Sequence, residues 1–286
     1  MATLIPPDTT ASRGRFRVGK IPLYAILILG AAVSLLPFVW TVSTSLKAAD
    51  QVFDYPPKWI PDPAVWGNYR EALETIGLRA FVNSVGVAGS IVLLQGLVAT
   101  MGGFAFARLR FPGRDQLFLI YLGTMMIPPQ VTMIPTFIVV VEFGWIDTYQ
   151  GLILPVIAQG AFGTFLFRQF FLRIPDELYE AARLDGATPW NMYWKLTLPL
   201  ARPALTAYGM ITFLTAWNLY LWPLILVRSP EMKLVPLAIA ELSGGFVADR
   251  AVVMAAVNLS ILPILALWIF GQRWFVEGIA LSGLKG

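Results

Sequence analysis

Few residues of this chain could perform chemistry. The sequence has no cysteine and no histidine, which leaves out thiolate nucleophiles, thiolate metal sites and the usual general base. Residues Gly14–Lys20 spell most of a phosphate-binding P-loop, but Ile21 stands where a hydroxyl should meet Mg²⁺, and no strand precedes the string. We therefore expect no catalytic residue, no metal site and no cofactor held by this chain alone.

The segment 174–186 has the features of a short docking helix. Pro175 suits the first helical position, and Asp176 and Glu177 complement the positive end of the helix dipole. Gly186 suits the left-handed residue that follows a helix end. The pattern predicts a helix with well-defined ends.

Small side chains and one acidic residue lie in the middle of this helix. Ala181 and Ala182 would let another protein approach the backbone closely, and Glu180 would be free to meet a basic residue. A second helix is predicted from Thr188 as N-cap and Pro189 in the first turn. We expect a compact helix–turn–helix over residues 174–199. The second helix would carry one stripe, made of Trp190, Tyr193, Trp194 and Thr197.

The elements that position this loop are expected to lie in lipid. The 286 residues are 57% hydrophobic and 13% charged, whereas a soluble domain has about 25% charged residues. A soluble core could not hide that much apolar surface. Net charge is only +4 and no basic run is present, so nucleic-acid binding has no support. The predicted fold class is an all-α integral membrane protein.

Six apolar stretches reach the length of about 20 residues that a helix needs to cross the hydrocarbon. The first is too long for a cleaved signal peptide and is interpreted as a retained span. A transmembrane domain over 21–276 would separate polar tails at 1–20 and 277–286. The six predicted spans are about 21–46, 80–107, 116–141, 148–167, 203–227 and 251–272.

Positive charges set the predicted orientation. With residues 1–20 placed in the cytoplasm, two thirds of the 21 Lys and Arg fall in inside segments. This bias favours both termini in the cytoplasm, loops 47–79 and 228–250 outside, and the loop 168–202 inside. The spans lack paired carboxylates and buried Lys or Arg, which ion-coupled carriers normally keep near mid-membrane. The energy for any transport would then come from elsewhere.

The loop 174–199 resembles the EAA loop of ATP-binding-cassette (ABC) importer permeases. The matching string is Glu180-Ala181-Ala182, then Gly186, Leu196 and Leu198-Pro199; the family usually has Ile at the position of Leu196. In that family the loop is the coupling helix, which docks into a cleft of the ATPase subunit and pairs its Glu with an Arg. The resemblance makes the coupling residues Glu180, Ala181, Ala182, Asp185, Gly186, Leu196 and Pro199.

A narrower resemblance covers roughly residues 20–286 and rests on segments 83–84, 103–113, 126–130, 167–171, 217–224 and 283–286. These segments look like the carbohydrate-uptake class, and within it the MalG-type subunit of maltose-like and glycerol-3-phosphate-like importers. The resemblance implies a type I ABC importer permease fold in a bacterial or archaeal cytoplasmic (inner) membrane. It implies as partners a second, MalF-like permease, two ATPase subunits that hold ATP and Mg²⁺, and an extracytoplasmic solute-binding protein.

Aromatic and amide side chains could line a sugar path, because aromatics stack on sugar faces and amides bond hydroxyls. An aromatic belt or interhelical hydrogen bonds would explain the same residues. The pair Gly102-Gly103 predicts a close contact between helices. The candidate path residues are Trp217, Asn218, Tyr220, Asn83 and Gln130.

The predicted function is that of a permease subunit, without enzymatic activity of its own, for sugars, oligosaccharides or glycerol-phosphate compounds. Three alternatives stay open. The first is an ABC permease for another solute, such as a polyamine or an amino acid. The others are an ion-coupled secondary carrier working alone and a membrane scaffold that transports nothing.

Overall fold

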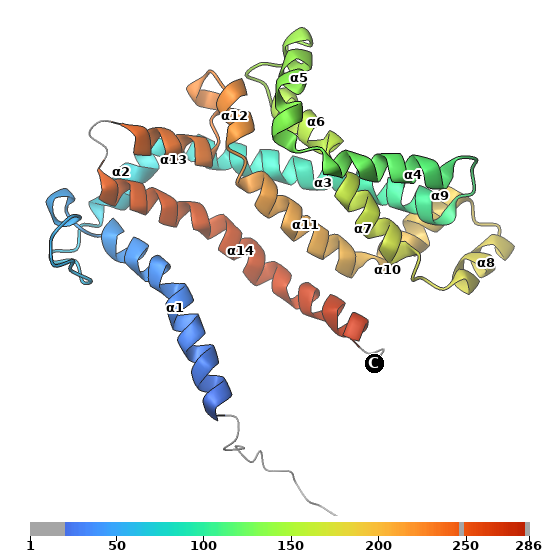
Figure 1. The fold of residues 1–286 in the computed structure, drawn as a ribbon, viewed down its shortest axis with the longest axis horizontal. Helices are drawn as coiled ribbons and strands as arrows, with labels where there is room; N and C mark the ends of the chain where they lie inside the picture. Colours follow the sequence, from blue (N-terminus) through green and yellow to red (C-terminus); the bar gives the residue numbers. More distant parts are fainter. Residues whose placement is uncertain (1–20, 246–248, 284–286) are drawn as a thin grey trace, which may run out of the picture.

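The computed structural model describes residues 21–245 and 249–283, and these residues form helices and no strand. The predicted tail 1–20 lies outside the described residues. The backbone of 277–283, predicted as part of a tail, instead continues the last helix. The all-α prediction is confirmed for the described part of the chain, which forms an elongated body (Figure 1).

Three continuous helices are long and apolar enough to cross a membrane. They are α1 (Ile21–Ser45), α3 (Leu78–Arg108) and α14 (Arg250–Gly283). Helices α1 and α3 agree closely with predicted spans, and α14 covers its predicted span 251–272 and continues beyond it. An unbroken apolar run of this length has no better conformation in lipid than a helix. The outer faces of α1 are exposed along nearly its whole length, and its main contact is with α14.

The other three predicted spans are each divided by a break in the helix. The third divides into α4 (Arg114–Gly123), a short turn η3 (Thr124–Met126) and α5 (Pro129–Glu142), bent by 99°. The fourth divides into α6 (Tyr149–Ala158) and α7 (Ala161–Phe171), bent by 48°. The fifth divides into α11 (Arg202–Trp217) and α12 (Leu221–Leu226). The three continuous helices and two of these bent pairs, α4 with α5 and α6 with α7, give up to five spans within the described residues; α11 and α12 are not included in this total.

Local chemistry accounts for these breaks. Pro128 is extended, with ψ 134°, and Pro129 begins α5, so the chain cannot donate the hydrogen bonds that would continue α4. Gln159 and Gly160 leave helical geometry between α6 and α7. Tyr220, at φ −125° and ψ −57°, separates α11 from α12. Hydropathy averaged over a span cannot reveal such single-residue departures.

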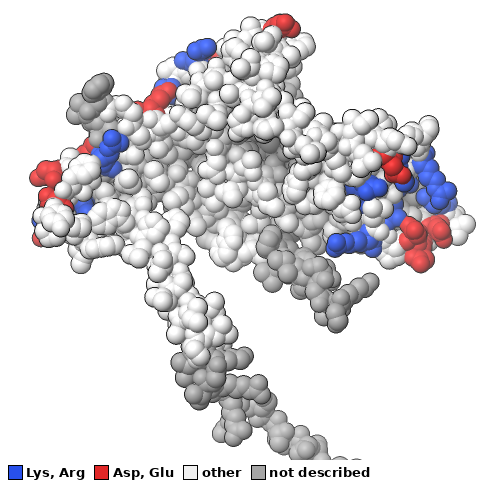
Figure 2. Space-filling view, viewed as in Figure 1, with Lys and Arg blue, Asp and Glu red and all other residues white. Residues whose placement is uncertain are grey.

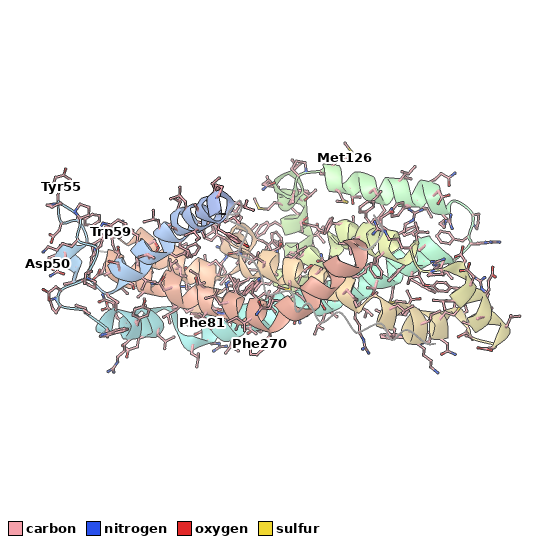
Figure 3. The ribbon with its side chains drawn as sticks, turned by 90° about the horizontal axis from the view of Figure 1, so that it is seen from below. Asp50, Tyr55, Trp59, Phe81, Met126 and Phe270 are labelled. Carbon is pink, nitrogen blue, oxygen red and sulfur yellow. The ribbon has the colours of Figure 1, made fainter. Side chains whose placement is uncertain are left out.

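Short helices occupy the predicted outside loops. The loop 47–79 contains η2 (Ala49–Gln51) and α2 (Gly67–Ile76), and Tyr55 projects from its exposed part (Figure 3). The loop 228–250 contains η5 (Pro230–Met232) and α13 (Val235–Gly244). In Figure 2 charged side chains gather at the two ends and along the upper edge of the body, and a broad uncharged region lies between them. This distribution fits a protein whose middle faces lipid.

Helix α3 lies at the centre of the packing and contacts α7 most extensively. At Gly103 an added Cβ would lie 2.7 Å from Phe167 Cβ and 2.9 Å from the backbone nitrogen of Arg168. At Gly102 it would lie 3.1 Å from Thr164 Cγ2. The predicted close contact at the glycine pair is therefore confirmed.

Candidate functional site

The first helix of the loop 174–199 forms as its end signals predict. It is α8 (Asp176–Leu184), preceded by Pro175 as an extended N-cap, one residue later than predicted. Asp176 and Glu177 stand in its first turn. Gly186 has φ 79°, a left-handed conformation, and its N–H bonds to the carbonyl of Arg183.

The second part of the loop departs from a regular helix. It consists of α9 (Pro189–Asn191), a π-helical turn η4 (Met192–Thr197) and α10 (Leu198–Leu200). Thr188 caps it as predicted, because its side chain accepts from the N–H of Asn191 at 3.3 Å. The wider π turn divides the predicted stripe. Tyr193 and Thr197 are buried, whereas Trp190 and Trp194 are exposed.

The predicted coupling residues divide into an outward and an inward group. Glu180, Ala181, Asp185, Gly186 and Pro199 are exposed. Ala182 and Leu196 are half-buried and pack on a hydrophobic cluster shared with α3 and α7. Sequence reasoning missed Leu184, whose side chain is 90% exposed at the end of α8.

Within the described part of the chain, the Glu180 carboxylate has no ion pair and no side-chain hydrogen bond. Glu180 and Leu184 lie four residues apart, so they share one side of α8. An exposed acid beside an exposed apolar side chain gives this surface the chemistry of a small protein-docking site. It contains no arrangement for catalysis.

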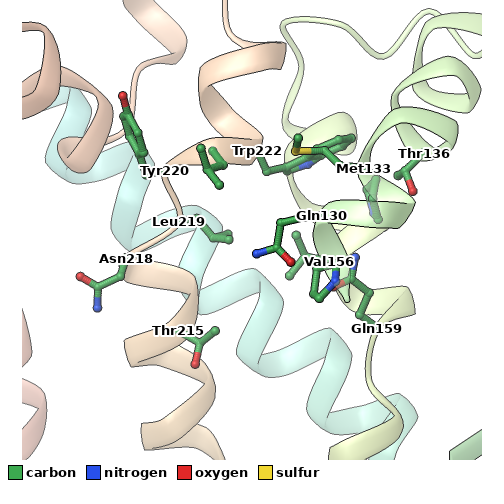
Figure 4. A pocket seen from close by; sticks show the side chains of 13 residues that line it. Gln130, Met133, Thr136, Val156, Gln159, Thr215, Asn218, Leu219, Tyr220 and Trp222 are labelled. Atoms are coloured by element: carbon green, nitrogen blue, oxygen red, sulfur yellow. The ribbon is translucent and has the colours of Figure 1, made fainter. Parts of the chain in front are cut away.

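A cavity of about 370 Å³ lies where the three broken spans meet (Figure 4). Gln130 extends into it from the first turn of α5, and Gln159 and Thr215 border it from the α6–α7 break and from α11. Its lining residues include no Lys, Arg, Asp or Glu. A neighbouring cavity of about 190 Å³ shares Gln159 and Thr215 and continues along α11. Amides, hydroxyls and apolar side chains suit a solute rich in hydroxyl groups.

The structure brings three of the five predicted path residues together at this cavity. They are Gln130, Asn218 and Tyr220. The Asn218 amide donates to the carbonyl of Leu214 at 2.8 Å, so it also completes the end of α11.

The other two predicted path residues, Asn83 and Trp217, do not line the cavity. The Asn83 amide donates to the carbonyls of Glu231 and Lys233 and accepts from the Tyr149 hydroxyl. Trp217 is 2% exposed and stacks on Phe213 at 5.8 Å between ring centroids. Asn83 therefore joins α3 to α6 and to the turn η5, and Trp217 packs in a hydrophobic cluster shared with α2, α13 and α14.

Sequence reasoning missed several residues of the cavity wall. Gln159, Thr215 and Trp222 line it, and the Trp222 indole donates to the carbonyl of Gly151 at 3.0 Å. Gln159 and Trp222 stand at or close to helix breaks, and such a break within an apolar segment is itself a signal of a cavity. In membrane proteins, irregular backbone is tolerated where it lines a cavity or is buried in protein.

The described residues form long apolar helices, broken spans around an uncharged cavity and an exposed docking helix at one end of the body. This is the architecture of a membrane permease. The model of the family "binding-protein-dependent transport system inner membrane component" matches residues 99–281. This chain belongs to that family.

Full-length relatives agree with this assignment. The sn-glycerol-3-phosphate transport system permease protein UgpE of Yersinia enterocolitica is 37% identical over 267 residues, which cover 90% of this chain and 94% of the relative. The protein of the same description from Brucella abortus is 36% identical over 268 residues, which cover 90% of this chain and 94% of the relative.

Solved structures share the fold. A chain of a bacterial ABC transporter involved in the import of the acidic polysaccharide alginate has a TM-score of 0.78 at 24% identity. The alignment covers 91% of this chain and 97% of that chain. A chain of the MetNI methionine ABC transporter has a TM-score of 0.55 at 18% identity, over 73% of this chain and 98% of that one. The predicted ABC importer permease fold is thereby confirmed.

Proposed function

We propose that this chain is the permease subunit of a binding-protein-dependent ABC importer for sugars, oligosaccharides or glycerol-phosphate compounds. The observation that carries the proposal is the similarity, over nine tenths of the chain, to glycerol-3-phosphate permeases of the same family. The uncharged cavity with its amides and hydroxyls supports hydroxylated solutes. Gln130, Asn218 and Tyr220 form part of the path for the solute.

Four partner chains would complete the importer. A second, MalF-like permease closes the other side of the path, and an extracytoplasmic binding protein delivers the solute. Two ATPase subunits hold ATP and Mg²⁺, so hydrolysis takes place outside this chain. The chain lies in a bacterial or archaeal inner membrane with both termini in the cytoplasm, as the bias of Lys and Arg favours.

In this proposal α8 is the coupling helix and receives force from the ATPase. ATP binding brings the coupling loops of the two permeases together and turns the cavity from inward-facing to outward-facing. The exposed Glu180 meets a basic residue of the ATPase, and Leu184 adds apolar contact area. Gly186 ends the helix without a side chain at the interface.

The deciding experiment is stimulation of ATP hydrolysis in the complete complex, reconstituted in proteoliposomes. The binding protein is added with a neutral oligosaccharide, with glycerol 3-phosphate, or with a polyamine or amino acid. Stimulation by one of the first two, together with its uptake, supports the proposal. Stimulation only by a polyamine or an amino acid refutes the solute class, and sodium- or proton-driven uptake by the chain alone refutes the importer.

The coupling surface is tested with Glu180→Ala. Loss of this charge should leave the chain in the membrane while solute transported per ATP falls, because the docking contact no longer forms. Glu142→Ala, the same charge change on an exposed residue at the end of α5, serves as the matched control. Unchanged uptake by Glu180→Ala in the assembled complex would count against α8 as the coupling helix.

A further inference from the structure

The last residue of α3, Arg108, contacts the start of α8 through one guanidinium group. Its Nη1 donates to the carboxylate of Asp176, the first residue of α8. Its Nη2 donates to the carbonyls of Phe171 and Ile174, which precede α8. Its central carbon lies 4.2 Å from the centroid of the Tyr179 ring, within α8. We call this set of contacts the Arg108 junction.

Arginine suits this junction for geometric reasons. Its side chain is only 9% exposed, so the charge needs partners in fixed directions. A planar guanidinium presents several N–H donors in a rigid fork and also packs flat on an aromatic ring. The single ammonium of lysine could not reach the carboxylate, two carbonyls and the ring in one geometry.

A second contact joins α3 to the rest of the loop. The hydroxyls of Thr100, on α3, and Tyr193, on η4, lie 2.8 Å apart and are buried. The hydroxyls of Tyr179 and Thr197 lie 2.9 Å apart, which joins α8 to η4. Thr100 and Arg108 are separated by about 12 Å along α3. These attachments at two positions along α3, Thr100 and Arg108, hold the whole loop 174–199 against the helix.

The N-terminal half of α3 contacts the cavity wall and the loop 228–250. Gln95 donates to the carbonyl of Val156, which lines the cavity, and accepts from the Tyr208 hydroxyl. Asn83 donates to two carbonyls around η5. Helix α3 is continuous over 31 residues, or about 46 Å, whereas α4 and α7 belong to bent pairs.

We propose that Arg108 is the positioning residue that transmits movement of the coupling helix α8 into α3, and through α3 to the cavity wall. The inference rests on the proposed function, because α8 must receive force from an ATPase. The Arg108 side chain is only 9% exposed and does not line the cavity. It keeps α8 and α3 moving as one body, so that displacement of α8 reaches Val156 without loss.

The test uses the complete complex in proteoliposomes and measures solute transported per ATP hydrolysed. Arg108→Gln should keep ATP hydrolysis while the transport ratio falls about tenfold, a size typical of coupling between two sites. Arg108→Lys should give a transport ratio between that of Arg108→Gln and that of the unchanged chain. Arg110→Gln, which removes an exposed arginine two residues away, should leave the ratio unchanged.

A second variant separates transmission from folding. Asp176→Asn removes the carboxylate, whose side chain is 80% exposed, and leaves the two carbonyls and the ring in place. It should lower the ratio less than Arg108→Gln, and the double variant should be no worse than Arg108→Gln alone. A normal ratio in assembled Arg108→Gln complex overturns the proposal. Failure of Arg108→Gln, Arg108→Lys and Asp176→Asn all to assemble also overturns it, because the residue would then only maintain the fold.

The two levels of inference fail in different ways. If the complex with the unchanged chain shows no solute-stimulated ATP hydrolysis, the proposed function fails before any variant is compared. If stimulation is present and the Arg108 variants transport normally, only the role of Arg108 fails.

Discussion

The contact between α3 and α7 at Gly103 allows a prediction with a worked magnitude. In Gly103→Ala the new methyl would lie 2.7 Å from Phe167 Cβ and 2.9 Å from the Arg168 nitrogen, about 0.7 Å short of ordinary contact in the first case. Both neighbours belong to or adjoin the backbone and cannot rotate away. The helices must therefore move apart over a contact surface that includes Phe104 and Phe167.

Two opposing effects decide whether Gly103→Ala raises or lowers the stability of the protein. Alanine in a helix interior gains about 0.5–1 kcal/mol over glycine. Overpacking of a tight contact costs about 1–3 kcal/mol. The central value of the cost exceeds that of the gain, so we expect Gly103→Ala to lower stability by about 1 kcal/mol. Gly86→Ala is the matched control, because the same helix leaves open space within 4 Å of an added Cβ there.

The measurement is the melting temperature of the purified complex in detergent, followed by tryptophan fluorescence and size-exclusion chromatography. Gly103→Ala should melt at least about 2 °C below the unchanged chain, since 1 kcal/mol corresponds to roughly 2–4 °C in chains of 150–250 residues. Gly86→Ala should melt at the same temperature or higher. If Gly103→Ala melts at the same temperature as Gly86→Ala, the close α3–α7 contact does not limit stability and the reasoning is wrong.

Three further predictions concern the loop, the outer turn and the cavity. Gly186→Val should lower transport per ATP, because the φ of 79° at this position is strained for a β-branched residue. Gly186→Asn should preserve transport per ATP, since asparagine tolerates that conformation. Equal effects of the two variants would indicate crowding at the surface instead of backbone strain. Hydrogen bonds from the backbone of Arg228 and Ser229 hold the pKa of Asp147 below its ordinary 3.8. The resulting stability should be present above pH 3.8 and be lost as the pH falls through the lower folded value, a step that Asp147→Asn should lack in acid melting curves. Gln130→Ala should raise the half-saturating solute concentration for uptake by about two- to tenfold, the loss of one hydrogen bond, and unchanged uptake kinetics would remove Gln130 from the path.

Local signals in the sequence predicted the local structure well. The turn at Gly186 and the cap at Thr188 follow from the conformations that these residues favour, without knowledge of the rest of the chain. The lengths of α1 and α3 follow from uninterrupted hydropathy. Such rules act within one or two turns of helix, so distant packing does not overturn them.

Tertiary packing decided what the sequence left open. Asn83 and Asn218 are the same residue type in apolar segments, yet Asn83 bonds the turn η5 and Asn218 borders the cavity. The π turn moved Tyr193 inward and left Trp194 outside, because one extra residue per turn changes which side chains share a face. The partners of Arg108 lie more than sixty residues away in the chain, beyond any spacing rule.

The contrast between α1 and α11 has a consequence for biosynthesis. The 24 apolar residues of α1, with mean hydropathy 2.3, lie almost entirely outside the core, so this helix can enter the bilayer as soon as it leaves the ribosome. At 16 residues, α11 covers only about 24 Å, and the chain beyond it breaks at Asn218. Helix α11 packs against α3, which is synthesised before it, and against α14, which is synthesised after it. Assembly of the permease is therefore completed only after α14 has been synthesised.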